Sequence, residues 1–327
     1  MRVNALSVTD SHVSYQLKNC KMAKVAILMC TYNGVSFLAE QLDSIKRQTH
    51  RNWTLHVSDD GSRDGTLELL QAFGAQRAAG EFQLIDGPRR GFVANFLSLT
   101  CRTDISAEFY AWSDQDDIWK DDKLHKALVW LQTIPSYIPA LYCGRTELIG
   151  ESGLPCGYSP RFRRPPHFSN ALVQNIGGGN TMVFNQAARN LIQEAGDSVD
   201  VPSHDWWAYQ LISGAGGKVY YDAEPMVLYR QHDANLVGTN SSWTAQLQRM
   251  RMIFHGRFYE WNAKNIYALE KMQHRLTADH QLTLHKFKEM RGKKFFRRVL
   301  DFSRIGLYRQ SFWGNFGLII ATFLKKI

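Results

Sequence analysis

The sequence predicts an α/β fold: a mostly parallel β-sheet flanked by helices, followed by a basic, helical C-terminal extension. Three observations predict it. Short apolar segments alternate with segments of helical spacing, each apolar segment ends in a polar turn, and the positive charge is concentrated in the last quarter of the chain. Strands that are covered by helices on both faces have this continuous apolar character, so the pattern favours a buried parallel sheet.

Predicted strands and helices alternate between residues 24 and 113. Apolar segments predict four strands, at residues 24–29, 53–58, 82–85 and 109–113. Helical spacing predicts three intervening helices, at residues 35–48, 64–73 and 92–99. Asp64 is expected to cap the second helix. Because strands joined by crossover helices run parallel, this order predicts a parallel, helix-covered sheet.

The rest of the chain has a mixed pattern. Further strands are expected at residues 141–149, 218–221 and 226–229, and a helix at 186–195. Residues 243–298 are helix-prone and basic. The predicted organisation is therefore a polar lead-in at 1–23, an α/β domain at 24–240 and a helical basic region at 241–327.

Composition and charge limit the function classes. The 327 residues are 44% hydrophobic and 21% charged, which are globular values. Residues 1–239 carry a net charge of −3 and residues 240–327 one of +12. This asymmetry disfavours a uniformly basic nucleic-acid binder, but it fits nucleic acid, an anionic membrane or a phosphorylated partner at the C-terminal end.

Localisation is predicted from two absences and from the cysteines. There is no secretory h-region and no apolar run of ~18 residues, so a cytoplasmic protein is expected. The 5 cysteines lack a C-x-x-C pair. We interpret them as ordinary thiols in a reducing compartment.

Polar clusters follow three of the predicted strands: CTYNG at 30–34, DDGSRDG at 59–65 and DQDD at 114–117. Ligands of such sheets bind at the carboxyl ends of the strands, so the clusters are expected to form one site. Asp114 and Asp116 offer oxygen ligands to Mg²⁺ or Mn²⁺, and a metal held there can stabilise a nucleotide diphosphate as leaving group. A solvated acidic loop is the alternative.

Five further residues are candidates, each with a structural alternative. Asp60 can accept hydrogen bonds from a ribose or a base, and Tyr32 can stack on a base. Asp205 lies beside tryptophans that could make it a general base, or it could cap a helix. His232 can complete a carboxylate metal site and Arg230 can bind phosphate, although a lone histidine is more often structural.

Taken together, the motifs resemble those of the family 2 glycosyltransferases, which have the GT-A fold. The resemblance rests on six segments in order: VAILMCTYNG (25–34), VSDDGSRDGT (57–66), SDQDDIW (113–119), GGGNTMVFN (177–185), HDWW (204–207) and YRQHDANLVG (229–238). The SDQDDIW and YRQH forms look most like bacterial rhamnosyltransferases of O-antigen, lipopolysaccharide and related cell-surface polysaccharide assembly.

The resemblance implies an inverting transfer from a sugar nucleotide, with dTDP-L-rhamnose as the suspected donor, and a divalent cation, Mg²⁺ or Mn²⁺. It implies Asp205 as general base and Asp116 with His232 as metal ligands. The implied nucleotide-binding residues are Thr31, Tyr32, Asn33, Asp60, Asn95 and Asp114. The implied diphosphate and acceptor region comprises Gly178, Gly179, Asn180, Trp206 and Arg230.

The sequence departs from the family pattern at two positions. Many members have Glu-Asp at the base position, where this chain has His204-Asp205. Some members have Ala-Arg-Asn after the third strand, where this chain has Val93-Ala94-Asn95. The aspartate is expected to keep its role, whereas the roles of its neighbour and of the contacts around the base stay open.

The C-terminal end suggests a membrane partner. Residues 286–309 carry nine Lys and Arg with interleaved aromatics, as in an interfacial helix on anionic lipid, and the apolar segment 312–324 is too short to span a bilayer. A peripheral location on the inner face of the cytoplasmic membrane is expected, with a polyprenyl-diphosphate-linked glycan as acceptor and no nucleic acid. Packing on the catalytic domain is the alternative.

Three other functions stay open. One is hexosyl transfer from a UDP-sugar. A second is sugar nucleotidyl transfer, which would need a glycine-rich, lysine-containing loop that residues 30–34 do not provide. The third is nucleic-acid binding by the basic end, which would leave the polar strand ends unexplained.

Overall fold

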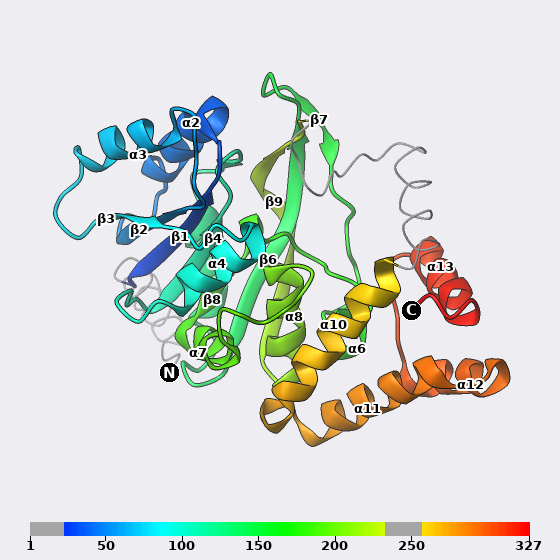
Figure 1. Cartoon of the computed structure of the whole chain (residues 1–327). Helices are drawn as coiled ribbons and strands as arrows, with labels where there is room; N and C mark the ends of the chain where they lie inside the picture. The colour runs from blue at the N-terminus through cyan, green and yellow to red at the C-terminus, as the bar shows by residue number, and fades with distance from the viewer. Residues whose placement is uncertain (1–22, 233–256) are drawn as a thin grey trace, which may run out of the picture.

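The predicted strand and helix alternation is present in the computed structural model, which describes residues 23–232 and 257–327 (Figure 1). The first four strands are β1 Val25–Thr31, β2 Trp53–Asp59, β3 Phe82–Asp86 and β4 Phe109–Ser113. The helices between them are α2 Val35–Lys46, α3 Thr66–Gly74 and α4 Phe92–Cys101. The helix at α3 begins two residues after Asp64, whose carboxylate accepts the backbone N–H of Thr66 at 3.0 Å.

The sheet is parallel in its first half and mixed in its second. Its order is β3-β2-β1-β4-β8-β6-β9-β5, with β7 paired to β6. Strands β3, β2, β1 and β4 pair in parallel, as predicted, whereas β8 is antiparallel to both β4 and β6. The later strands are β5 Ile118–Trp119, β6 Ala140–Ile149, β7 Pro155–Tyr158, β8 Val183–Asn185 and β9 Lys218–Arg230.

The two short strands expected at 218–221 and 226–229 form the single strand β9. It runs parallel to β6, and its register shifts between the pairs Gly144–Asp222 and Thr146–Val227. The extra residues of β9 form a bulge at this point, so the polar stretch that interrupts the apolar pattern does not end the strand. β9 thereby carries Arg230 to the edge of the sheet where the acidic loop after β4, residues 114–117, lies.

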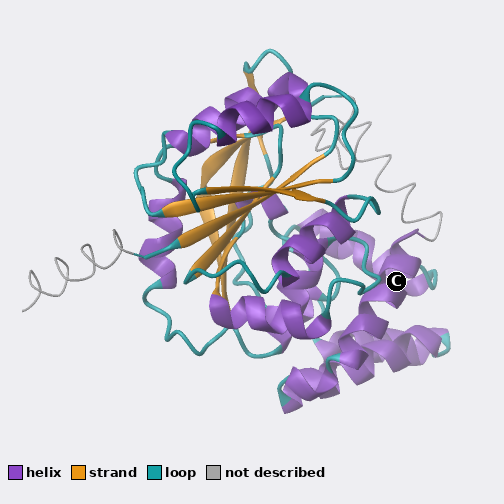
Figure 2. Cartoon of the chain, turned by 60° about the vertical axis from the view of Figure 1, so that its left-hand side comes forward, coloured by secondary structure: helices purple, strands orange, loops and turns teal. Residues whose placement is uncertain are grey.

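Helices cover both faces of the sheet, which explains the continuous apolar sequence of β1 (Figure 2). Val25, Ile27 and Met29 join a core that also contains residues of α2, α3 and α5 (Lys123–Leu131). The alternate β1 residues join a second core with α4, α6, α7 and α8. The last three of these helices are α6 Phe168–Ala171, α7 Gln186–Ala195 and α8 His204–Gly214.

The C-terminal helices pack on this second core. They are α10 Arg257–Lys271, α11 Ala278–Gly292, α12 Phe295–Ile305 and α13 Phe312–Phe323, with a short turn η2 at Gln273–Arg275. Leu269, Phe287 and Leu318 from α10, α11 and α13 are buried in the core that also contains the second face of β1. Burying one such side chain stabilises the fold by roughly 1.5–3 kcal/mol. α10 lies beside α8 in Figure 1.

Three predictions fall wholly or partly outside the described residues: the lead-in at 1–23, of which only Ala23 is described, the domain boundary at 240/241, and the part of the helix-prone region 243–298 that precedes residue 257. The helical character of the C-terminal region is confirmed over residues 257–327. Within the described ranges, the helices are all too short or too polar to cross a membrane. The four cysteines that these ranges contain are free.

Candidate active site

The loops after β1 and β2 are bonded to each other. Thr31 Oγ1 donates to Asp59 Oδ2 at 2.7 Å, and Asn33 Oδ1 accepts the backbone N–H of Arg63 at 2.8 Å. Asn33 has a positive φ of 48°, a conformation that asparagine tolerates better than most residues. Thr31 and Asn33 therefore hold the loops that surround Tyr32, which is 58% exposed.

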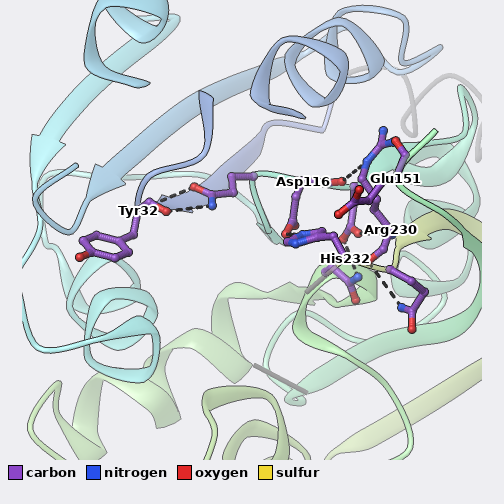
Figure 3. Close-up of polar contacts among 9 residues, drawn as sticks. Tyr32, Asp116, Glu151, Arg230 and His232 are labelled. Atoms are coloured by element: carbon purple, nitrogen blue, oxygen red, sulfur yellow. Dashed lines mark hydrogen bonds and ion pairs between the residues drawn. The ribbon is translucent and has the colours of Figure 1, made fainter. Parts of the chain in front are cut away.

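The ring of Tyr32 is exposed, whereas its backbone N–H and carbonyl are both hydrogen-bonded. The side chain of Gln115 accepts from the Tyr32 N–H at 2.8 Å and donates to its carbonyl at 3.0 Å. Figure 3 shows the Tyr32 ring directed away from Asp116, Arg230 and His232. An exposed ring at one end of the site and carboxylates at the other suit an elongated ligand with a base and a diphosphate.

Asp60 organises the loop between β3 and α4. Its Oδ1 accepts the N–H of Arg89 at 2.6 Å, and its Oδ2 accepts that of Gly91 at 2.8 Å. Each carboxylate oxygen can accept a second hydrogen bond, so Asp60 retains capacity for a ligand.

Asn95 does not reach the surface of the site, contrary to the expectation of nucleotide contact. The residue is 1% exposed. Its Nδ2 donates to the Ser58 carbonyl at 2.9 Å, and its Oδ1 accepts from Ser58 Oγ at 2.5 Å. The amide is thus committed to the end of β2, which it ties to α4.

The acidic loop after β4 meets the end of β9. Asp116 Oδ2 lies 2.8 Å from Nε2 of His232, although 116 residues separate them in the sequence (Figure 3). The two implied metal ligands are therefore brought together. Their side chains are 19% and 11% exposed, so the pair is largely shielded from solvent.

The donor set fits Mg²⁺ or Mn²⁺, although it is incomplete on protein groups alone. Over residues 23–232 and 257–327, no three His, Cys, Asp or Glu side chains are grouped to hold a metal. Mg²⁺ in nucleotide sites is commonly bound by one or two carboxylates, with substrate phosphates and water completing the shell. Asp116 supplies the carboxylate of this partial set, and His232 beside it offers an imidazole nitrogen, which transition metals bind more readily than Mg²⁺ does.

Arg230 supports the acidic loop and is not available to a diphosphate in this structure. Its side chain is 1% exposed, and all three guanidinium nitrogens are engaged. Nε donates to the Asp116 carbonyl at 3.1 Å, Nη1 to the Glu151 carbonyl at 2.8 Å, and Nη2 pairs with Glu40 Oε2 at 3.0 Å (Figure 3). In this structure Arg230 therefore supports the main chain of Asp116, and its contact with a diphosphate stays a prediction.

Asp205 lies in the first turn of α8, where the helix dipole favours a negative charge. Its Oδ1 accepts from Ser203 Oγ at 2.5 Å and from the Trp206 N–H at 2.7 Å. Its Oδ2 accepts the Gly179 N–H at 3.2 Å. These three donors fix the orientation of the carboxylate, as a general base requires.

The glycine segment connects Asp205 with the acidic loop. Gly179 and Asn180 lie in the short turn η1 Gly179–Thr181, and Gly178 before it is exposed. Asn180 is 3% exposed, and its Nδ2 donates to Asp117 Oδ2 at 2.6 Å. The buried amide of Asn180 thus supports Asp117, and its place in the acceptor region stays a prediction.

Trp206 is buried in this structure, and its contact with an acceptor stays a prediction. Its side chain is 5% exposed and its Nε1 donates to the Ala171 carbonyl at 2.7 Å. The indole stacks on Phe258 of α10 with centroids 6.2 Å apart, and Trp261 meets it edge-on at 6.4 Å. Trp206 therefore joins the helix of Asp205 to the C-terminal helices.

The negative charges of Asp116 and Asp205 act on the buried carboxyl group of Asp114. Burial, together with the negative charges of Asp116 and Asp205, raises the pKa of Asp114 to about 8. Asp205, on α8, is connected to the loop after β4 through Gly179, which donates to Asp205, and the adjacent Asn180, which donates to Asp117. A divalent cation at this loop would favour the ionised form of the carboxylates.

A family model described as Glycosyl transferase family 2 matches residues 26–190, half of the chain. The chain belongs to the family 2 glycosyltransferases. It is 27% identical over 242 residues to "dTDP-rhamnosyl transferase RfbG" of Shigella flexneri, covering 69% of this chain and 78% of the relative. It is 28% identical over 168 residues to "UDP-Glc:alpha-D-GlcNAc-diphosphoundecaprenol beta-1,3-glucosyltransferase WfgD" of Escherichia coli, covering 51% and 62%.

A solved structure confirms the expected GT-A fold. S. aureus TarS 1–349 in complex with UDP-GlcNAc superimposes with a TM-score of 0.51, over 93% of this chain and 90% of TarS. The sequences are 12% identical, so this likeness concerns the fold alone.

Two buried residues of this glycosyltransferase site escaped prediction. Asp117 is 1% exposed, and burial together with Asp116 and Asp114 raises its pKa well above the usual range. Lys123 is fully buried, with Nζ 3.4 Å from the Trp119 ring centroid, and burial lowers its pKa. Asp117 adjoins the DQD motif and could have been found there. Lys123 gave no signal, because a lysine at a helix start is ordinarily exposed.

His204 occupies the position where many family 2 glycosyltransferases have Glu. It is 4% exposed and stacks on Phe96 with centroids 4.0 Å apart, with Trp112 edge-on at 4.7 Å. Neither ring nitrogen has a hydrogen-bond partner among the described residues. Burial lowers its pKa to about 4, so the ring is neutral at physiological pH.

This burial predicts a pH dependence of stability. Unfolded chains protonate a histidine below about pH 6.5, whereas folded His204 is protonated only near pH 4. The free energy of unfolding should therefore fall as the pH decreases from 6.5 to 4, by about 3 kcal/mol from this residue. Urea unfolding across this range should show a shallower decline for His204→Phe than for the wild type.

A control removes an exposed histidine instead. His285 on α11 has a side chain 65% exposed, so His285→Phe should keep the wild-type slope. The other buried titratable groups are common to all three proteins, and differences between their profiles isolate His204. Parallel profiles for the wild type and His204→Phe would contradict the prediction.

Proposed function

We propose that this family 2 glycosyltransferase is an inverting, metal-dependent rhamnosyltransferase. It transfers L-rhamnose from dTDP-L-rhamnose to a hydroxyl of a lipid-linked oligosaccharide in bacterial O-antigen or related polysaccharide assembly. The observation that supports the proposal is the hydrogen-bonded connection from Asp205 through Gly179 and Asn180 to Asp117 of the acidic loop, which puts a carboxylate base beside the proposed donor-binding edge. The name of the Shigella relative supports the choice of donor.

The proposed reaction is a single displacement. The acceptor hydroxyl oxygen forms a bond to the anomeric carbon while the bond from that carbon to the diphosphate oxygen breaks on the opposite face. Asp205 accepts the hydroxyl proton, and its three hydrogen bonds hold the carboxylate in place for this transfer. Inversion of a β-L-rhamnosyl donor gives an α-L-rhamnoside.

Asp116 and His232 would hold the divalent cation. When bound, the cation supplies positive charge that stabilises the leaving diphosphate. Arg230 holds the main chain of Asp116, and Asn180 holds Asp117, so the loop is supported before a ligand arrives. Tyr32, exposed at the far end of the site, is proposed to stack on the base, and Asp60 to bind near it.

A UDP-hexose donor is the second candidate, because the Escherichia coli relative is named for UDP-Glc. That relative is also named for a diphosphoundecaprenol-linked acceptor, which supports a polyprenyl-diphosphate-linked acceptor here. We further propose that the protein works as a peripheral protein on the inner face of the cytoplasmic membrane, where such acceptors would be presented to it.

A donor panel tests the proposed function. The protein is incubated with dTDP-L-rhamnose, UDP-glucose, UDP-galactose or GDP-mannose and a membrane-lipid extract, with Mg²⁺, Mn²⁺ or a chelator. The expected result is dTDP release from dTDP-L-rhamnose alone, stimulated by the extract and abolished by the chelator. Release only from a UDP-sugar would replace the donor, and release that survives chelation would overturn the metal dependence. No release from any donor would overturn the proposal.

A further inference from the structure

Helix α13 exposes a cluster of aromatic side chains. Phe312 is 78% exposed, Trp313 76% and Phe316 51%, and neighbouring ring centroids lie 5.6 and 6.2 Å apart. The opposite face of the helix packs on the core through Leu318 and Ala321. A contiguous apolar surface of this kind on an otherwise packed helix marks an interaction site.

The surroundings of this cluster are positively charged. Residues 155–171 and 302–327 together contain seven Lys and Arg and no Asp or Glu. In the first segment, Arg161, Arg163 and Arg164 are exposed. In the second, Lys325 follows α13 directly and is exposed as well.

Direct contacts join the two segments into one surface. The Arg164 N–H donates to Gln310 Oε1, and Gln310 Nε2 donates back to the Arg164 carbonyl, both at 3.0 Å. Tyr308 Oη donates to the Pro165 carbonyl at 2.7 Å, and the Arg164 guanidinium lies 3.9 Å from the Tyr308 ring centroid. The arginines of residues 161–164 are therefore held beside the start of α13.

We propose that the exposed face of α13 and the arginine loop 161–164 form the surface that binds an anionic lipid bilayer. This inference rests on the proposed function, in which the acceptor is carried by a lipid. Phe and Trp side chains enter the boundary between headgroups and acyl chains, and arginines beside them are attracted to anionic headgroups. The absence of acidic residues from both segments matches this partner in charge.

The surface differs from the segment that the sequence suggested, residues 286–309. Several basic side chains of that segment are paired with other groups of the protein. Lys288 pairs with Glu270 at 2.5 Å, Arg291 Nε donates to the Ile327 carbonyl at 2.8 Å, and buried Arg298 donates to the Thr322 carbonyl at 2.8 Å. Arg298 thus holds the end of α13, and the segment acts as the support of the proposed surface.

The proposed surface is connected to the helix of Asp205 through α6. Asn170 Nδ2 donates to the Tyr308 carbonyl at 2.9 Å, and its Oδ1 accepts from Tyr209 Oη of α8 at 2.9 Å. Trp206 of α8 donates to the carbonyl of Ala171. A bilayer bound at α13 would therefore lie on the side of the protein where α6 contacts α8, the helix that carries Asp205.

Sedimentation of the full chain with lipid vesicles tests the proposal. The wild type should pellet with phosphatidylcholine vesicles that contain phosphatidylglycerol, and high salt or the absence of phosphatidylglycerol should reduce this binding. Phe312→Ser/Trp313→Ser and, separately, Arg163→Gln/Arg164→Gln should each weaken binding by about tenfold or more. Because all four side chains are exposed, circular dichroism should show unchanged folding.

Matched controls separate the surface from general charge and apolarity. Lys286→Gln/Arg297→Gln removes two exposed charges from the other segment, and Tyr267→Ser removes a 58% exposed ring from α10. Both should bind vesicles as the wild type does. Equal losses in the controls, no wild-type binding, or sedimentation of the free wild type as a dimer that Phe312→Ser/Trp313→Ser dissociates would overturn the proposal.

A separate readout keeps this test independent of the proposed function. Metal-dependent binding of dTDP, measured by calorimetry without lipid, should be the same for the wild type and both surface variants. Failure of vesicle binding with intact dTDP binding would overturn the membrane surface alone. If the wild type does not bind dTDP, the proposed donor is contradicted.

Discussion

Replacing Asp205 by Asn is expected to lower the rate of sugar transfer by a factor of about 10² to 10⁴ while donor binding persists. The amide cannot accept the acceptor proton, yet its oxygen can still accept from Ser203 Oγ and the Trp206 N–H. The measurement is a single-turnover transfer assay, paired with calorimetric binding of dTDP in the presence of Mn²⁺.

The control for this variant is Asp200→Asn. Asp200 lies five residues earlier, is 70% exposed and pairs only across the surface with Lys264, so its variant should retain wild-type turnover. Equal loss of donor binding and of turnover in Asp205→Asn would show that the carboxylate supports the fold of the site, and it would contradict the role of general base.

Replacing Asp116 by Asn is expected to lower kcat/KM for the donor by about a hundredfold or more, chiefly through weaker metal binding. The substitution exchanges a charged ligand for a neutral one and removes the carboxylate that lies 2.8 Å from His232. Mn²⁺ binding, followed by electron paramagnetic resonance with dTDP present, should shift to higher metal concentrations in the variant.

Asp121→Asn is the matched control for Asp116→Asn. Asp121 is 60% exposed and lies five residues later, where it pairs with Arg47 at 3.4 Å. Its variant should give the wild-type Mn²⁺ titration. If the Asp116→Asn titration coincided with that of the wild type, Asp116 would not be a metal ligand, and the pair with His232 would be structural.

The sequence predicted the parts of the site that depend on topology. Polar segments after parallel strands must meet at one edge of the sheet, so the convergence of the loops around Thr31, Asp60 and Asp114 followed from the strand order. The pairing of Asp116 with His232 depended on the family resemblance. The structure brings these two residues together, which spacing alone could not show.

The burial and the hydrogen-bond partners of several polar side chains could not be predicted from the sequence. Arg230, Asn95 and Asn180 have residue types that suit a ligand, but each is buried on a partner within the protein. Arg230 pairs with Glu40, 190 residues away, and such a partner leaves no local pattern in the sequence. A polar residue near a strand end can serve a ligand or a neighbouring loop, and burial decides between them.

The second half of the sheet was predictable only in pieces. The apolar segments of β9 were recognised, but the polar residues of its bulge resembled a turn. Strand β6 pairs antiparallel with β8 but parallel with β9. Pairing partners of strands far apart in sequence depend on tertiary packing, which periodicity does not encode.

The stacking of Trp206 on Phe258 bears on how such enzymes diversify. Because the residue next to the proposed base packs directly on α10, the C-terminal helices are not an independent module that recombination can exchange freely. A chimera that joined this sheet to the C-terminal helices of another glycosyltransferase would have to restore the aromatic contact at Trp206.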